Sequence, residues 1–139
     1  MGKIHTKLMV INNIDETLFK KHYIKKEEIR KIELPDVLID TGATTLALPK
    51  KMIAQLDLEF MKTVAVSTAT GISERKIFQN VKVRLMERET ICECIELPDD
   101  AQPLLGVIPL EAMGVELDLQ SQKLKLLPYD LLSTYITVI

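Results

Sequence analysis

The chain of 139 residues has few aromatic side chains and almost no net charge. It has no tryptophan, only 4% aromatic residues, and a formal charge of -2 from 18 basic and 20 acidic side chains. Without an excess of positive charge or a set of rings for base stacking, the composition does not predict binding to nucleic acid. Without a long apolar run it predicts no membrane span, and we expect the protein to be cytoplasmic.

Cysteine is also scarce. Cys92 and Cys94 are the only two and stand two residues apart, so they cannot build a disulfide framework. No second pair of thiols and no nearby histidine completes a zinc site. His5 and His22 lie in charged surroundings, which favours solvated side chains over a nucleophilic Cys/His arrangement. We therefore expect structural cysteines, no metal and no cofactor.

What the chain does contain is enough apolar residues, 47%, for the core of a single domain. Alternating apolar and polar residues predict short strands, among them residues 4–11, 81–85 and 89–97. Residues 115–119 and 123–126 alternate on either side of a polar turn and predict a hairpin. Residues 15–31 are rich in Lys and Glu. They either contain a helical turn after Asp15 or form a solvated excursion between two strands, and we favour the second interpretation.

Two short helices are predicted where a proline precedes residues suited to a helix. One covers Lys50 to Leu56 after Pro49, and the other runs from Pro109 to Gly114, which can adopt the left-handed conformation that ends a helix. Each helix follows an apolar segment that ends in a glycine, and each precedes a strand-like segment. This faint internal repeat is typical of two related β units.

The segment from Val37 to Thr44 is the sharpest candidate for chemistry. It places Asp40 at the end of an apolar strand, where we expect the carboxyl group to be buried, and continues with Thr41 and Gly42. An acid in apolar surroundings is a candidate for catalysis, the hydroxyl can form hydrogen bonds, and the glycine lets another chain approach closely. By itself, Asp-Thr-Gly is equally compatible with a turn that merely follows a strand.

Two motifs in a particular order favour the catalytic interpretation. With Asp40-Thr41-Gly42-Ala43 and the later Leu104-Leu105-Gly106, the chain resembles the retropepsin-like aspartic proteases, and especially their small bacterial members, from about residue 4 to residue 128. The resemblance implies an all-β fold: a closed, mostly antiparallel barrel with two short helices. It also implies an aspartic endopeptidase that cleaves peptide or protein substrates. In it the catalytic residue is Asp40, the supporting residues of the active-site loop are Thr41, Gly42, Ala43 and Thr44, and the hydrophobic-glycine loop is Leu104, Leu105 and Gly106.

The resemblance further implies a flap near residues 67–73, between strands at 63–66 and 76–85. Its substrate-binding residues would be Thr68, Ala69, Thr70, Gly71 and Ile72. Taken alone, this segment predicts only a hairpin with a polar turn, and it holds one glycine where viral flaps hold several. Viral members also often pair an acid after the first motif with an arginine after the later glycine. Thr44 and Val107 stand at those places, so other contacts must stabilise the loops.

A single Asp-Thr-Gly motif supplies one of the two carboxyl groups that aspartic protease chemistry requires. The two groups must be close enough to share a proton, so that one acts as acid and the other as base. The other aspartates stand in polar or turn contexts typical of solvated side chains. We therefore expect a homodimer with Asp40 of each subunit on a two-fold axis. The alternative is a catalytically inactive homodimeric module of the same fold that binds extended peptides by strand addition.

The sequence also predicts a domain boundary near the C-terminus. We assign residues 1–128 to one protease domain and residues 129–139 to an apolar extension. This extension either adds a strand at the dimer interface or covers the core, and the sequence favours neither alternative.

Overall fold

The computed structural model describes residues 3–128, so the predicted C-terminal extension at 129–139 lies outside the described residues. Within 3–128, no helix is long and apolar enough to cross a membrane. The elements follow the chain in the order β1 (Ile4–Asn12), α1 (Asn13–Lys20), the 3-10 helix η1 (Lys26–Glu28), β2 (Lys31–Ile39), β3 (Leu46–Pro49), α2 (Lys50–Leu56), β4 (Glu59–Thr68), β5 (Gly71–Leu85), β6 (Arg88–Leu97), β7 (Leu104–Leu105), α3 (Val107–Ala112), β8 (Val115–Asp118) and β9 (Lys123–Leu126).

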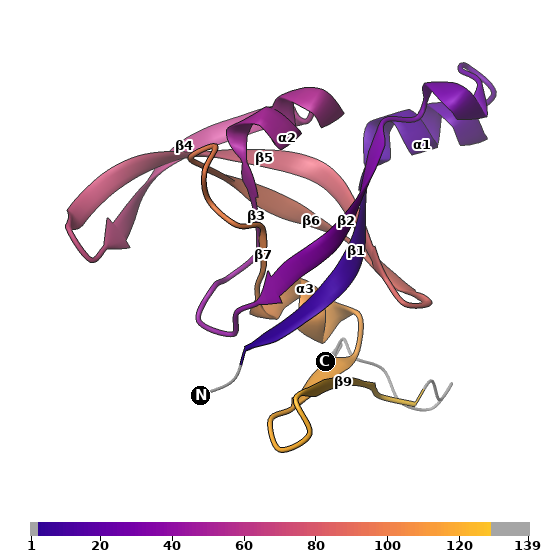
Figure 1. Ribbon diagram of the computed structural model, residues 1–139. Coiled ribbons are helices and arrows are strands. Elements are labelled where there is room, and N and C mark those ends of the chain that lie inside the picture. The colour runs from indigo at the N-terminus through magenta and orange to yellow at the C-terminus, as the bar shows by residue number, and fades with distance from the viewer. Residues whose placement is uncertain (1–2, 129–139) are drawn as a thin grey trace, which may run out of the picture.

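Seven of the strands form one sheet in the order β1-β2-β7-β3-β6-β5-β4, and β1 also pairs with β5 (Figure 1). β1 pairs with β2 on one edge and with β5 on the other. Followed from β1 through β2, β7, β3, β6 and β5, the pairings therefore return to β1. Most pairs are antiparallel, but β2–β7 and β3–β6 are parallel. β8 and β9 form a separate antiparallel hairpin, as predicted for residues 115–126. The mostly-β fold with the two expected short helices is confirmed.

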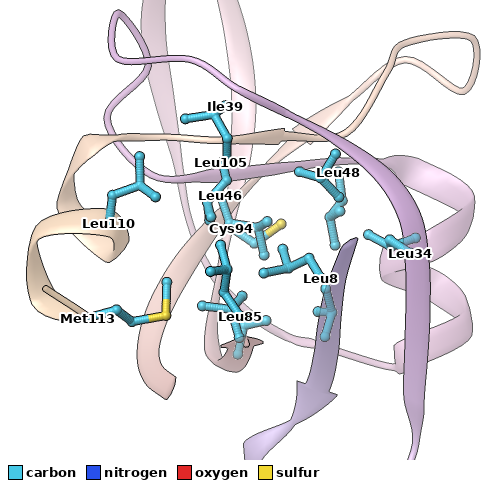
Figure 2. Packing of buried hydrophobic residues seen from close by; sticks show 14 of the residues in the cluster. Leu8, Leu34, Ile39, Leu46, Leu48, Leu85, Cys94, Leu105, Leu110 and Met113 are labelled. Carbon is cyan, nitrogen blue, oxygen red and sulfur yellow. The ribbon is translucent and has the colours of Figure 1, made fainter. Parts of the chain in front are cut away.

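The hydrophobic core lies between these strands. Leu46 of β3, the strand after the Asp40 motif, and Leu105 of β7, within the later motif, are fully buried beside Cys94 of β6. Leu110 and Met113 approach from the side of α3 (Figure 2). Strand alternation turns Cys94 inward, which agrees with the predicted structural role of this cysteine. The strand ends that carry the two motifs are therefore anchored in one packed cluster.

The segment between β1 and β2 differs from the interpretation that we favoured. Residues 13–20 form helix α1, because the Asn12 side chain accepts a hydrogen bond from the Asp15 N–H at 3.1 Å and so caps the first turn. Arg30 closes the segment through ion pairs with Asp15 at 2.9 Å and Asp57 at 3.0 Å. Because charged residues are so frequent in this segment, its apolar residues show no clear helical periodicity. The only helix signals in the sequence are the N-cap Asn12 and the acidic residues of the first turn.

Both predicted helices are present, with small differences at their starts. α2 begins at Lys50, and Pro49 is the last residue of β3. α3 begins at Val107, two residues before Pro109, because the extended Gly106 precedes its first turn. Proline is tolerated there because the first N–H groups of a helix have no partner within the helix. Gly114 follows α3 with φ 67°, as predicted.

Candidate active site

The two predicted motifs lie side by side because the strands that carry them are neighbours. β2 and β7 pair in parallel, with Leu38 opposite Leu104 and Ile39 opposite Leu105. The backbone N–H of Asp40, directly after β2, donates a hydrogen bond to the Leu105 carbonyl at 3.0 Å. The fold thus joins the Asp40 loop to the hydrophobic-glycine loop through main-chain hydrogen bonds.

Directly after β7, backbone hydrogen bonds between residues 106–108 and residues 43–45 interlock the two loops. Three consecutive N–H groups donate to three consecutive carbonyls: Gly106 to Thr45 at 3.0 Å, Val107 to Ala43 at 2.9 Å and Ile108 to Thr44 at 3.0 Å. A Cβ atom at Gly106 would lie 2.5 Å from the Ala43 carbonyl oxygen and 2.6 Å from the Thr45 nitrogen. Real side-chain atoms do not come so close to backbone, so the interlock requires glycine at position 106. These backbone bonds stabilise loops that lack an acid–arginine pair.

Asp40 itself is partly exposed, so the predicted burial of its carboxyl group is wrong. β2 ends at Ile39, which is buried, and the chain then turns to the surface through the exposed residues Thr41 and Gly42. The Gly42 N–H donates to Asp40 Oδ1 at 2.9 Å, and the Ala43 N–H donates to the Asp40 carbonyl at 3.0 Å. The turn therefore holds one carboxylate oxygen in place and leaves the carboxyl group within reach of solvent and of another molecule.

The predicted flap is the tip of a long hairpin formed by β4 and β5, which extends to the left in Figure 1. Both strands are longer than predicted. Thr68 pairs with Gly71 across the two-residue turn Ala69-Thr70, and the Thr68 hydroxyl donates to the Gly71 carbonyl at 2.8 Å. Ile72 is 80% exposed. Among residues 3–128, no hydrogen bond joins these tip residues to the Asp40 loop.

A pocket of about 520 Å³ beside the Asp40 loop is the feature that sequence reasoning missed. It is lined by Thr44 and Thr45 of the loop, Lys62 and Val64 of β4, Ile77 of β5, Ile91, Cys92, Glu93 and Ile95 of β6, and Ile108 of α3. The alternation of β6 shows in the sequence that Ile91 and Ile95 share a face, but it does not reveal what that face meets. Burial raises the pKa of the Cys92 thiol to about 11, so this side chain is a neutral wall of the pocket and no nucleophile.

Comparison with known proteins gives one family and one fold. A family model described as gag-polyprotein putative aspartyl protease matches residues 23–111, which include both motif loops. An EIAV protease, solved in complex with the inhibitor HBY-793, is similar in structure with a TM-score of 0.55 and 19% sequence identity, over 85% of this chain and 94% of that chain. No curated protein matches the chain. At this low identity, the structural likeness shows the fold alone.

Proposed function

Because the chain belongs to the family of gag-polyprotein putative aspartyl proteases, we propose that it is an aspartic endopeptidase whose active site forms only when two copies associate. The observation that carries the proposal is the Asp40 turn. One carboxylate is held by the Gly42 N–H, stands partly exposed and is braced by the glycine loop. A chain with a single such turn offers half of the acid–base pair that the chemistry needs.

Two Asp40 carboxyl groups on a two-fold axis would share one proton, because two like charges a few ångströms apart do not both ionise. The ionised group takes a proton from a water molecule, and the water oxygen forms a bond to the peptide carbonyl carbon. The protonated group gives its proton to the carbonyl oxygen. When the tetrahedral intermediate collapses, the C–N bond breaks and the amine leaves with a proton returned by the dyad.

The residues around Asp40 take positioning roles in this proposal. The exposed Thr41 hydroxyl is available to the loop of the second subunit, and Gly42 leaves room for the substrate backbone. The circuit of six paired strands, which we interpret as the closed barrel, gives these loops a rigid support. The hairpin tip around Gly71 covers the bound peptide as a flap.

A second candidate function is a binding module without catalysis. The observation in its favour is β4, which pairs only with β5 among the described strands and keeps its other edge open. An extended peptide can add to such an edge through backbone hydrogen bonds. The two candidates differ in what Asp40 does. Loss of the Asp40 charge should abolish cleavage by a protease, whereas it should leave peptide binding at the β4 edge unchanged.

The test is cleavage of an unfolded protein from about pH 3 to about pH 8, a range that spans the titration of a carboxyl dyad. We expect cleavage by the wild type, inhibition by a pepstatin-like compound, and none by Asp40→Asn. Asp100→Asn, which changes an exposed aspartate on another loop, serves as the matched control and should stay active. Cleavage that survives Asp40→Asn contradicts the dyad mechanism, and peptide binding without cleavage favours the second candidate.

Subunit mixing tests the dimer separately. If subunits pair at random, equal amounts of wild type and Asp40→Asn leave about one quarter of the dimers with two intact aspartates. The activity per wild-type chain should then fall by about half, whereas active monomers would lose nothing. Sedimentation of the wild type at the assay concentration gives the independent check, and an active species that sediments only as a monomer rules out the shared site.

A further inference from the structure

A second hollow, named here the α1 pocket, lies at the end of β2 opposite to Asp40. Residues of β1, α1, η1, β2, β5 and β6 and the single residue Ile29 line it, and its volume is about 340 Å³, within the range of sites that bind small ligands. β2 runs from Lys31 in this pocket to the Asp40 loop (Figure 1). Nine strand residues at about 3.3 Å each place the two sites roughly 25–30 Å apart.

Positive charge exceeds negative charge around the α1 pocket. The charged side chains that line it are Lys20, Lys26, Lys31 and Arg84, and the carboxylates Glu16 and Glu89. The buried Lys82 pairs with both carboxylates, with Glu89 at 3.0 Å. Five cations and two carboxylates leave a surplus of three positive charges, on a chain whose formal charge is -2. The surplus is therefore local to this pocket.

Both carboxylates are already occupied by cations of the protein. Glu16 lies 3.5 Å from the Lys20 ammonium group and 3.9 Å from the Arg84 guanidinium group, in addition to its contact with Lys82. Glu89 pairs with Arg84 at 3.1 Å. The two acids thus balance the inner cations of the pocket and leave its other lysines uncompensated.

Those other lysines are Lys26 of η1 and Lys31 of β2. Both are exposed, and neither side chain pairs with a carboxylate of residues 3–128. Glu27 and Glu28 follow Lys26 along the chain but do not line the pocket, and Glu28 accepts a hydrogen bond from the Lys25 N–H at 2.9 Å. Two ammonium groups at the pocket are therefore available to an anion from outside.

The remaining lining residues are apolar. Ile11 is buried, while Phe19 and Ile29 are half-buried, so a ring and an aliphatic side chain stay partly in contact with water. A lysine ammonium group is a point charge that binds carboxylate and phosphate alike, but an inorganic anion would leave this apolar surface uncovered. A peptide that carries carboxylates beside an aliphatic side chain fits both parts of the pocket.

We propose that the α1 pocket binds an acidic segment of the protein substrate, in which Glu or Asp flanks an aliphatic residue. The recruitment of substrate rests on the proposed protease function, whereas binding of the segment does not. An extended chain spans at most about 3.6 Å per residue, so a distance of roughly 25–30 Å requires at least about seven residues. The acidic segment must therefore lie seven or more residues from the bond that is cut. Such tethering lowers KM and leaves kcat unchanged, because the reacting groups are the same.

Binding is tested first, by NMR titration of the wild type with acetyl-Glu-Leu-Glu-Glu-amide. We expect shifts in the methyl signals of Ile11 and Ile29 and a Kd that rises with salt. The double variant Lys26→Glu/Lys31→Glu should weaken binding at least about tenfold. Lys7→Glu/Lys123→Glu makes the same change of charge on exposed lysines outside the pocket and should bind as the wild type does.

Three related probes decide what the pocket recognises. Acetyl-Gln-Leu-Gln-Gln-amide, which lacks the charges, and acetyl-Glu-Ser-Glu-Glu-amide, which lacks the aliphatic side chain, should both bind more weakly. If either matches the first peptide, or if the first peptide does not bind, the assignment is overturned. Tripolyphosphate that binds as tightly as the acidic peptide also overturns it, since the pocket is then a phosphate site.

Recruitment is tested with peptides that share one cleavable sequence and differ in the position of a Glu-Leu-Glu-Glu tail. With the tail ten residues from the cut bond, we expect KM of the wild type to fall at unchanged kcat; with the tail three residues away, neither should change. Lys26→Glu/Lys31→Glu should cleave the untailed peptide as the wild type does and gain nothing from either tail.

The outcomes keep the pocket and the proposed function apart. A KM advantage that persists in Lys26→Glu/Lys31→Glu, or that is equal for both tail positions, overturns recruitment through the α1 pocket. If the wild type cleaves no peptide, the protease proposal fails and recruitment fails with it, while the titrations still decide whether the pocket binds acidic segments.

Discussion

Gly106→Ala is the substitution that most directly probes how the two loops are joined. The new methyl carbon would lie 2.5 Å from the Ala43 carbonyl oxygen, 2.7 Å from the Ala43 carbonyl carbon and 2.6 Å from the Thr45 nitrogen. Ordinary contacts begin at 3.4 Å, so these atoms must separate by almost 1 Å. All three are backbone atoms, which cannot swing aside as the end of a long side chain can.

The cost follows from the bonds that such a movement breaks. The three hydrogen bonds between the loops are 2.9–3.0 Å long, and a shift of almost 1 Å takes them beyond hydrogen-bond distance. Each contributes about 1 kcal/mol net, so their loss alone destabilises the fold by about 3 kcal/mol. Any overlap that remains adds about 1–3 kcal/mol of strain. Against a typical total of about 5–15 kcal/mol, this is a large fraction of the free energy of unfolding.

The assay combines urea unfolding with peptide cleavage. We expect the midpoint of Gly106→Ala to fall sharply at an unchanged m-value, together with a loss of kcat, since the Asp40 N–H is bonded to Leu105 beside the altered residue. Gly71→Ala is the comparator in the unfolding assay. Its added carbon meets no atom within 4 Å, so it reports only the strain of φ +128°, about 1–3 kcal/mol. A Gly106→Ala protein that unfolds at the wild-type urea concentration and keeps its activity refutes the close-packed interlock.

Two further predictions concern charges that attach α1 to the rest of the fold. Burial would raise the pKa of Glu16, but its ion pair with Lys82 outweighs this and holds the pKa below the usual value. Lys82→Met removes the ion-pair partner that Glu16 and Glu89 share. The free energy of unfolding should fall by about 2 kcal/mol in urea titrations at neutral pH, and an unchanged midpoint contradicts this expectation. The hydrogen bonds from Arg30 hold the pKa of the buried Asp15 below its usual value, so their stabilisation is complete above about pH 4 and disappears as the pH falls through the lowered pKa. Asp15→Asn should therefore destabilise the protein at pH 7 by about 2 kcal/mol and progressively less in acid, and a pH-independent difference in midpoint argues against the ion pair.

Much of the fold could be predicted because it depends on local patterns. The alternation in residues 4–11, 89–97 and 115–126 predicts strands that the structure confirms. The segment 13–20 was assigned incorrectly because its charges conceal the short apolar face, although Asn12 and Asp15 carry a normal helix-capping signal. The strands of the hairpin were predicted too short, because β4 is almost wholly exposed and shows little apolar alternation.

The candidate site was predictable in its residues but less so in its geometry. Asp40 and Gly106 stand in motifs that can be recognised along the chain. The partial exposure of Asp40 could not be predicted, since an apolar strand before an acid does not reveal where the chain turns next. The pocket beside the Asp40 loop could not be predicted either, because its walls come from five separate segments that only the packed sheet brings together.

The sequence alone therefore determined the strand-rich class, the two motif loops and the single Asp-Thr-Gly motif on which the proposed dimer rests. These follow from local propensity and from the number of carboxyl groups that the chemistry needs. Only the tertiary structure decided that β7 lies beside β2, that Gly106 must be glycine because of the Ala43 and Thr45 backbone, and that the outer face of β6 forms a pocket next to Thr44. The physical reason is that these are contacts between segments far apart in the chain, and they exist only where the core strands pack together.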